Sequence, residues 1–151
     1  MIHENFGLKG KLHLVLRDKD GNIILERQEN NLVVQGGREF ITSRILGNTS
    51  TVMSHMAIGT SSTAAATAQT TLLGEVGRVA LTSSAQQTVT LSNDSVRFIA
   101  TFPAGTGTGA LREAGVLNNS SGGTMLCRSV FDLITKGAGD SLTVTWTVTL
   151  L

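Results

Sequence analysis

Four oxygen-bearing side chains near the start of the chain have the spacing of a calcium-binding loop. Asp18, Asp20, Asn22 and Glu29 stand at positions one, three, five and twelve of such a loop. Position six, where the loop needs glycine for its sharp turn, is Ile23, and the flanking residues have the pattern of strands rather than helices. Asp, Asn and Gly also form tight hairpin turns, because they accept positive φ and bond locally. The sequence therefore favours a hairpin turn over a calcium site.

The other candidates for chemistry are three histidines, one cysteine and a glycine-rich loop. His3, His13 and His55 lack the i, i+2 or i, i+4 spacing of metal ligands, and Cys127 lies in an apolar stretch typical of a core thiol. The loop G-T-G-T-G at 105–109 lacks the Lys and Ser/Thr of a phosphate cradle and the helix that would follow it. We therefore expect a non-enzymatic role, with no metal and no cofactor.

The composition limits the classes of protein to which the chain can belong. The chain has 151 residues, of which 40% are hydrophobic and 15% charged, which suits one folded domain. The net charge of +1 offers no electrostatic footprint for nucleic acid or for an anionic membrane. No apolar run approaches the ~20 residues of a membrane span, and the start M-I-H-E-N-F-G lacks the features of a secretion signal. Synthesis in the cytoplasm is the resulting expectation.

The segment 141–151 has the clearest secondary-structure signal. Two residue classes alternate strictly along it: Leu142, Val144, Trp146, Val148 and Leu150 on one parity, and Thr143, Thr145, Thr147 and Thr149 on the other. Successive side chains of a strand point to opposite faces, so this pattern predicts a core strand with one apolar and one hydroxyl face. The hydroxyl face suits either solvent or a subunit interface.

The preceding residues predict a short arm, a hairpin and one helix. Residues 1–9 are mixed, with isolated apolar side chains, and form an arm that is either mobile or docked on a neighbour. Residues 10–28 form a β-hairpin. Gly36 and Gly37 open the next element, and residues 38–46 form a short helix that packs Phe40, Ile41 and Ile45 on the sheet.

Short strands with turn signals recur from residue 54 onward. They include strands at 79–82 and 87–92, and turns fall every eight to twelve residues, as in an antiparallel sandwich. The fold class is therefore mostly β: an antiparallel β-sandwich, closed as a jelly roll, with residues 10–151 in a single domain.

Low-complexity residues at 60–71 predict a surface loop, and such loops often carry contacts. We expect four interface regions, each represented by two residues: Phe6 and Leu8 in the arm, Asp18 and Asp20 in the hairpin turn, Thr63 and Thr67 in the loop, and Thr143 and Thr145 on the last strand.

Several stretches resemble a group of small virion proteins of tailed bacteriophages. The first, M-A-I-G-T at 56–60, leads through the small-residue loop to T-L-L-G-E-V-G-R at 71–78. The others are E-A-G-V-L-N at 113–118, G-G-T-M-L-C-R at 122–128 and T-V-T-W at 143–146. The resemblance covers about the last hundred residues of the chain, and none of its motifs is catalytic.

The resemblance implies a part of a virion. It favours a capsid cement (decoration) protein, bound as a homotrimer on the capsid surface between capsomers of the major capsid protein and stabilising the phage head. A tail-fibre or baseplate protein is the alternative, and a glycan-binding β-sandwich is a third class. The absence of tyrosine and the single tryptophan argue against the third, since sugar sites favour aromatic platforms.

Overall fold

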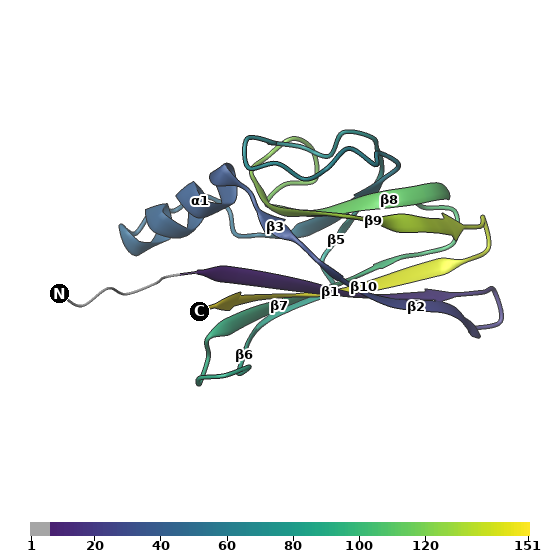
Figure 1. Ribbon diagram of the computed structural model, residues 1–151, viewed down its shortest axis with the longest axis horizontal. Coiled ribbons are helices and arrows are strands. Elements are labelled where there is room, and N and C mark those ends of the chain that lie inside the picture. Colours follow the sequence, from purple (N-terminus) through teal and green to yellow (C-terminus); the bar gives the residue numbers. More distant parts are fainter. Residues whose placement is uncertain (1–6) are drawn as a thin grey trace.

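Two five-stranded antiparallel sheets pack face to face in the computed structural model, which describes residues 7–151 (Figure 1). In spatial order the first sheet contains β2 (Ile23–Asn30), β1 (Leu8–Arg17), β10 (Ser141–Leu150), β7 (Ser95–Phe102) and β6 (Ser83–Gln87). The second contains β3 (Leu32–Val33), β9 (Met125–Lys136), β8 (Gly109–Leu117), β4 (His55–Gly59) and β5 (Glu75–Ala80). The predicted mostly-β antiparallel sandwich with one short helix is confirmed.

The sandwich is assembled from hairpins. β1 pairs with β2, β4 with β5, β6 with β7 and β8 with β9, each pair within one sheet, and the chain changes sheet only between these units. The finer prediction of a jelly roll is not established by this strand order.

Strand β10 lies in the middle of the first sheet, and its apolar face is the core face, as predicted. Trp146 is fully buried and stands between Leu12 of β1 and Phe98 of β7 in the strand register. Leu142 and Val144 are also fully buried. Burying side chains of this size stabilises the fold by roughly 1.5–3 kcal/mol each before conformational entropy is subtracted.

The N-terminal hairpin is longer than predicted. Strand β1 begins at Leu8, because Leu8 pairs with Leu150 and the whole of β1 follows β10 in register. Residues 8 and 9 therefore belong to a strand and not to the arm predicted at 1–9, and β2 continues to Asn30. Residues 1–6, including Phe6, lie outside the described residues.

Helix α1 spans Gln35–Ile45 rather than 38–46, because Gly36 and Gly37 lie in its first turn instead of preceding it. A Cβ at Gly37 would stand 2.0 Å from the carbonyl oxygen of Leu126, so glycine lets the helix approach β9 closely. Phe40 and Ile41 pack against the core as predicted, but Ile45 is 81% exposed and does not. No helix of residues 7–151 has the length and apolar character needed to cross a membrane.

The prediction of a strand at 87–92 is wrong. β6 ends at Gln87, and Val89 and Leu91 are exposed in the loop that follows. The Asp94 carboxylate binds the backbone N–H groups of Val89, Thr90 and Leu91, so these donors are not available for a sheet. The strand predicted at 79–82 is the end of the longer β5.

Replacing Trp146 by alanine tests whether β10 organises the core. We expect Trp146→Ala to lower the free energy of unfolding by roughly 3–5 kcal/mol, because the ring is fully buried. Thr145→Ala, one residue away on the opposite face, is the control and should change it by less than about 1 kcal/mol. Chemical denaturation measures both, and equal losses would contradict the assignment of faces.

Candidate functional site

The aspartates of the hairpin turn serve the turn itself. Asp18 Oδ1 accepts the backbone N–H groups of Asp20 at 2.9 Å and Asn22 at 3.0 Å, and Oδ2 accepts the Asn22 side-chain amide at 3.2 Å. The hydrogen bond from the Asn22 backbone is the main cause that lowers the pKa of Asp18. Both carboxylate oxygens therefore already have partners, as in a hairpin turn rather than a calcium loop.

The other residues singled out for chemistry also have structural surroundings. Cys127 is fully buried in the core, and desolvation raises the pKa of its thiol well above the ordinary value. His13 Nε2 lies 2.6 Å from Glu26 Oε1 on the outer face of the first sheet. Within residues 7–151 no three His, Cys, Asp or Glu side chains are grouped as metal ligands would be.

A buried ion pair lies on the side of the second sheet that faces away from the core. Glu113 of β8 and Arg128 of β9 are both 0% exposed. Arg128 Nε donates to Glu113 Oε2 at 2.9 Å, and Nη2 lies 2.8 Å from the same oxygen without a hydrogen-bond angle to it. Desolvating two charges is costly, so the pair must have further partners to be stable.

Those further partners come from the loop at 60–74. The Glu113 carboxylate accepts the backbone N–H groups of Gly74 at 2.6 Å and Leu73 at 3.1 Å, with a longer bond from Ser61 at 3.4 Å. Arg128 Nη1 donates to the Thr63 carbonyl and to Gln69 Oε1, both at 2.9 Å. The ion pair therefore holds both arms of the loop on the sheet.

The loop closes tightly because glycine stands beneath the carboxylate. A Cβ at Gly59 would lie 2.4 Å from Glu113 Oε1 and 2.6 Å from the Gly74 carbonyl oxygen, so no larger residue fits unless the loop moves. Leu72 of the loop belongs to a second apolar cluster with Val34, Ala57, Leu117 and Met125. The middle of the second sheet, β4 with the adjoining parts of β8 and β9, is therefore buried on both faces.

A neighbouring loop at 118–124 completes this outer covering. Arg78 donates to the carbonyls of Asn119 and Gly122, both at 2.9 Å, and pairs with Glu75. Glu75 and Arg78 share a face because a register shift interrupts β5 between them, so they pair within a strand and not in a helical turn. We call residues 60–74 and 118–124 the loop layer, which covers the second sheet (Figure 1).

Sequence reasoning missed the residues that hold the loop layer. Glu113 and Arg128 were visible only as charges inside apolar runs, A-L-R-E-A-G-V-L and M-L-C-R-S-V-F. Such a pattern suggests two charged residues that must neutralise each other inside the protein. Their pairing depends on the register of β8 and β9, in which Gly115 lies opposite Arg128.

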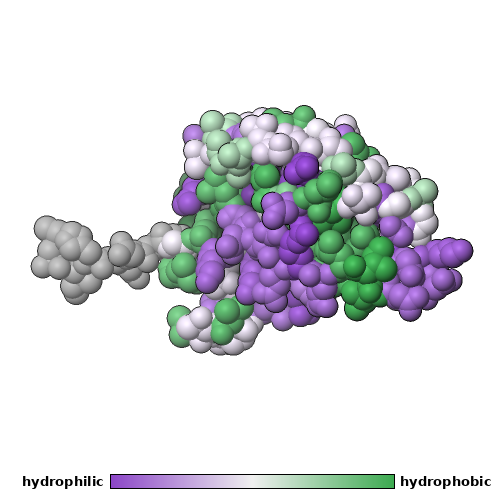
Figure 2. Space-filling model, turned by 45° about the vertical axis from the view of Figure 1, so that its right-hand side comes forward, coloured by the Kyte–Doolittle hydropathy of each residue, from purple (hydrophilic) through white to green (hydrophobic). Residues whose placement is uncertain are grey.

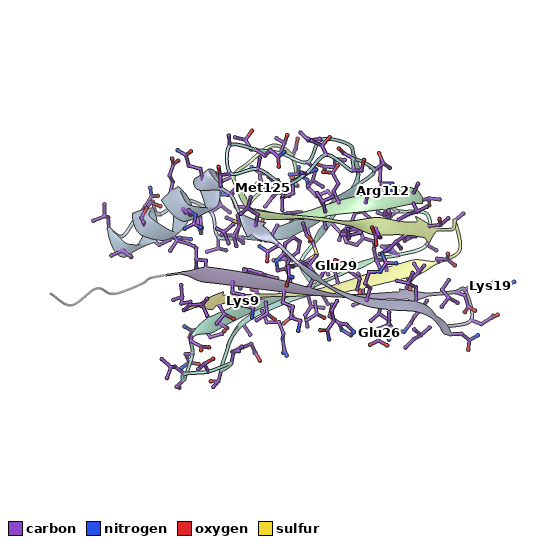
Figure 3. The ribbon with its side chains drawn as sticks, viewed as in Figure 1. Lys9, Lys19, Glu26, Glu29, Arg112 and Met125 are labelled. Atoms are coloured by element: carbon purple, nitrogen blue, oxygen red, sulfur yellow. The ribbon has the colours of Figure 1, made fainter. Side chains whose placement is uncertain are left out.

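The predicted interface residues lie on separate surfaces. Thr63 and Thr67 are exposed in the loop layer, while Asp18 and Asp20 lie at the hairpin tip. Thr143 and Thr145 are half-buried on the outer face of the first sheet, the side of Lys9 and Glu26 (Figure 3). Leu8 lies apart from all of these, at the end of the sandwich beside α1. Phe6 lies outside the described residues, and the structure does not bring the other seven together as one site.

An apolar groove of about 510 Å³ opens between α1 and the first sheet. We call it the end groove; its main apolar lining residues are Leu8, Phe40, Ile41, Val96, Phe98 and Leu150. Val52, at 62% exposed, and Leu150, at 44%, present apolar surface to solvent here. Apolar surface left open at one end of a sandwich is a candidate contact surface.

Comparisons of the chain with protein-family models, with curated proteins and with solved structures each return no match.

Removing the arginine of the buried pair tests its hold on the loop layer. We expect Arg128→Met to lower the free energy of unfolding by roughly 3–5 kcal/mol, since Glu113 is left buried without its cation. Amide hydrogen exchange in residues 60–74 should become faster. Glu26→Gln, which removes an exposed pair, is the control and should cost less than about 1 kcal/mol. Unchanged exchange in Arg128→Met, or in the milder Glu113→Gln, would contradict the proposed hold.

The pH dependence of stability tests whether the Asp94 carboxylate stabilises the loop after β6 through its hydrogen bonds. Hydrogen bonds from Leu91 and Val89 lower the pKa of Asp94 well below its ordinary value of 3.8. The stabilising contribution of this carboxylate is therefore complete above that value and is lost as pH falls toward the lower folded-state pKa. Asp94→Asn should reduce stability at neutral pH, and its difference from the wild type should shrink at about pH 2. Asp132→Asn, at an exposed aspartate, is the control in urea denaturation at both pH values.

Proposed function

We propose that this protein is a non-enzymatic structural component of a tailed-bacteriophage virion, a capsid cement protein that binds as a homotrimer between capsomers of the major capsid protein. The observation that carries the proposal is where the motifs of the resemblance lie. Residues of E-A-G-V-L-N, G-G-T-M-L-C-R and T-L-L-G-E-V-G-R meet beneath the loop layer, where Glu113 accepts hydrogen bonds from Arg128 and from the Gly74 backbone. These residues belong to the motifs by which the chain resembles the phage virion proteins, and their contacts support a structural module common to both.

The chemistry of the loop layer supports a role in assembly. Neither 60–74 nor 118–124 contains a charged residue, and this side of the molecule is mostly white to pale green (Figure 2). Burying such a surface against another protein avoids the cost of desolvating charges. The buried pair also holds the loop in place beforehand, so less conformational entropy is lost on binding. We therefore assign the loop layer as the shell-facing surface.

Stabilisation of the shell follows from mass action. A protein that binds the assembled shell but not the separated subunits shifts the equilibrium toward the shell. A trimer that bridges adjacent capsomers adds contacts that must break before the shell opens. The glycan-binding alternative lacks support, because the only tryptophan is fully buried and cannot stack on a sugar.

Binding to shells that lack the protein tests this function. Wild-type protein should saturate expanded shells at high copy number and raise the temperature at which they rupture. Thr67→Arg places a charge on the exposed loop layer and should weaken binding. Thr82→Arg adds the same charge at an exposed position after β5 and is the matched control. Both variants should melt like the wild type.

The number of copies per particle separates cement from the alternative. A few copies in purified virions, located at the tail, would replace the cement assignment with a tail-fibre or baseplate role. Equal binding by Thr67→Arg and Thr82→Arg would show that another surface faces the shell.

A further inference from the structure

The end groove leaves the core open where the chain enters the fold. Leu8, Leu150 and Val148 line it from the first sheet, and Phe40 and Ile41 line it from α1. The exposed helix end adds Ile45 and Leu46, at 81% and 90% exposed. This much apolar surface next to an opening into the core calls for an apolar occupant.

The described part of the chain begins beside this groove, at Gly7. Gly7 and Leu151 exchange both backbone hydrogen bonds, at 3.3 and 2.8 Å, and the next residue, Leu8, lines the groove. The six residues before Gly7 are M-I-H-E-N-F. In an extended segment Ile2, Glu4 and Phe6 project to one face, which suits a one-sided apolar groove.

The groove wall also carries a charge that complements this segment. Arg44 lines the groove, and its guanidinium lies 5.1 Å from the centre of the Phe40 ring. Glu4 has the same parity as Ile2 and Phe6, so its carboxylate would reach the wall alongside them. The segment thus offers two apolar anchors to the apolar lining and one acid to Arg44. Asp94 also lines the groove, but its carboxylate already accepts the backbone N–H groups of the loop after β6.

The direction of β1 decides which copy supplies the segment. The pairing of Gly7 with Leu151 continues the β1–β10 ladder past its last strand residues, so the chain still runs along β1 at this point. A segment of six residues can span at most about 20 Å when extended. Entry into the groove of the same copy would need a reversal that consumes most of the segment. We infer that residues 1–6 of one copy occupy the end groove of a second copy.

This contact is head-to-tail, because a segment of one copy meets a groove of the next. Such contacts close into rings when the rotation between copies allows it, and a trimer is one such ring. The inference concerns self-association alone and holds whether or not the protein binds a shell.

Site-specific cross-linking between differently tagged chains tests the exchange. One chain carries Asn5→Cys, which keeps Ile2, Glu4 and Phe6, and the other carries Ser84→Cys at an exposed position in the groove wall. The native Cys127 is fully buried and should not interfere. After the chains are co-expressed, mild oxidation should join the two tags. Asn5→Cys with Ile24→Cys, at the exposed hairpin tip, is the matched control and should give little product.

Sedimentation of single variants gives an independent readout. Phe6→Asp should shift the protein from oligomer to a monomer that keeps the circular dichroism spectrum of the folded chain, whereas Ile24→Asp should leave the oligomer intact. Two results would overturn the inference: a cross-link that forms only within one chain carrying both Asn5→Cys and Ser84→Cys, or an oligomer that Phe6→Asp does not weaken. A wild-type protein that forms the oligomer but does not bind shells would contradict the cement function and leave this inference standing.

Discussion

The buried pair of Glu113 and Arg128 is the interaction on which the second sheet and its loop layer depend. Both side chains are completely removed from water, and a pair of this kind is stable only when its remaining hydrogen-bonding groups are satisfied. Here the backbone of the loop supplies these partners from both of its arms. The loop needs the pair for anchorage, and the pair needs the loop to exclude water, so the two are stable together.

This mutual dependence gives the two sheets different characters. The first sheet has one face on the core and one toward solvent, so β10 alternates strictly between apolar residues and threonine. The second sheet has the core on one side and the loop layer on the other, so β8 and β9 are nearly continuous buried runs. Within those runs, Glu113 and Arg128 are the charged residues that bind the loop layer.

The proposed surfaces lie on different parts of the molecule. The loop layer is uncharged and held in place from within, which suits contact with a flat partner such as a shell. The end groove is apolar and opens beside the point where the described chain begins, which suits a segment from another copy. A protein with both surfaces would associate with itself and bind a second protein without competition between the two contacts.

The sequence by itself determined the elements whose signals are local. The alternation at 141–151 predicts the core strand, the Asp-Lys-Asp-Gly turn predicts the hairpin, and the spacing of Phe40 and Ile41 predicts a helix. Each depends on residues only a few positions apart, where side-chain periodicity and turn chemistry act directly.

Only the tertiary structure decided the features that join distant residues. The helix includes Gly37 because β9 lies against it, and Val89 and Leu91 leave the sheet because Asp94 binds their backbone. Glu113 and Arg128 meet only through the register of two strands, and the end groove exists only because α1 stands apart from the first sheet. These features depend on which backbones come close together, and that is set by packing across the whole chain.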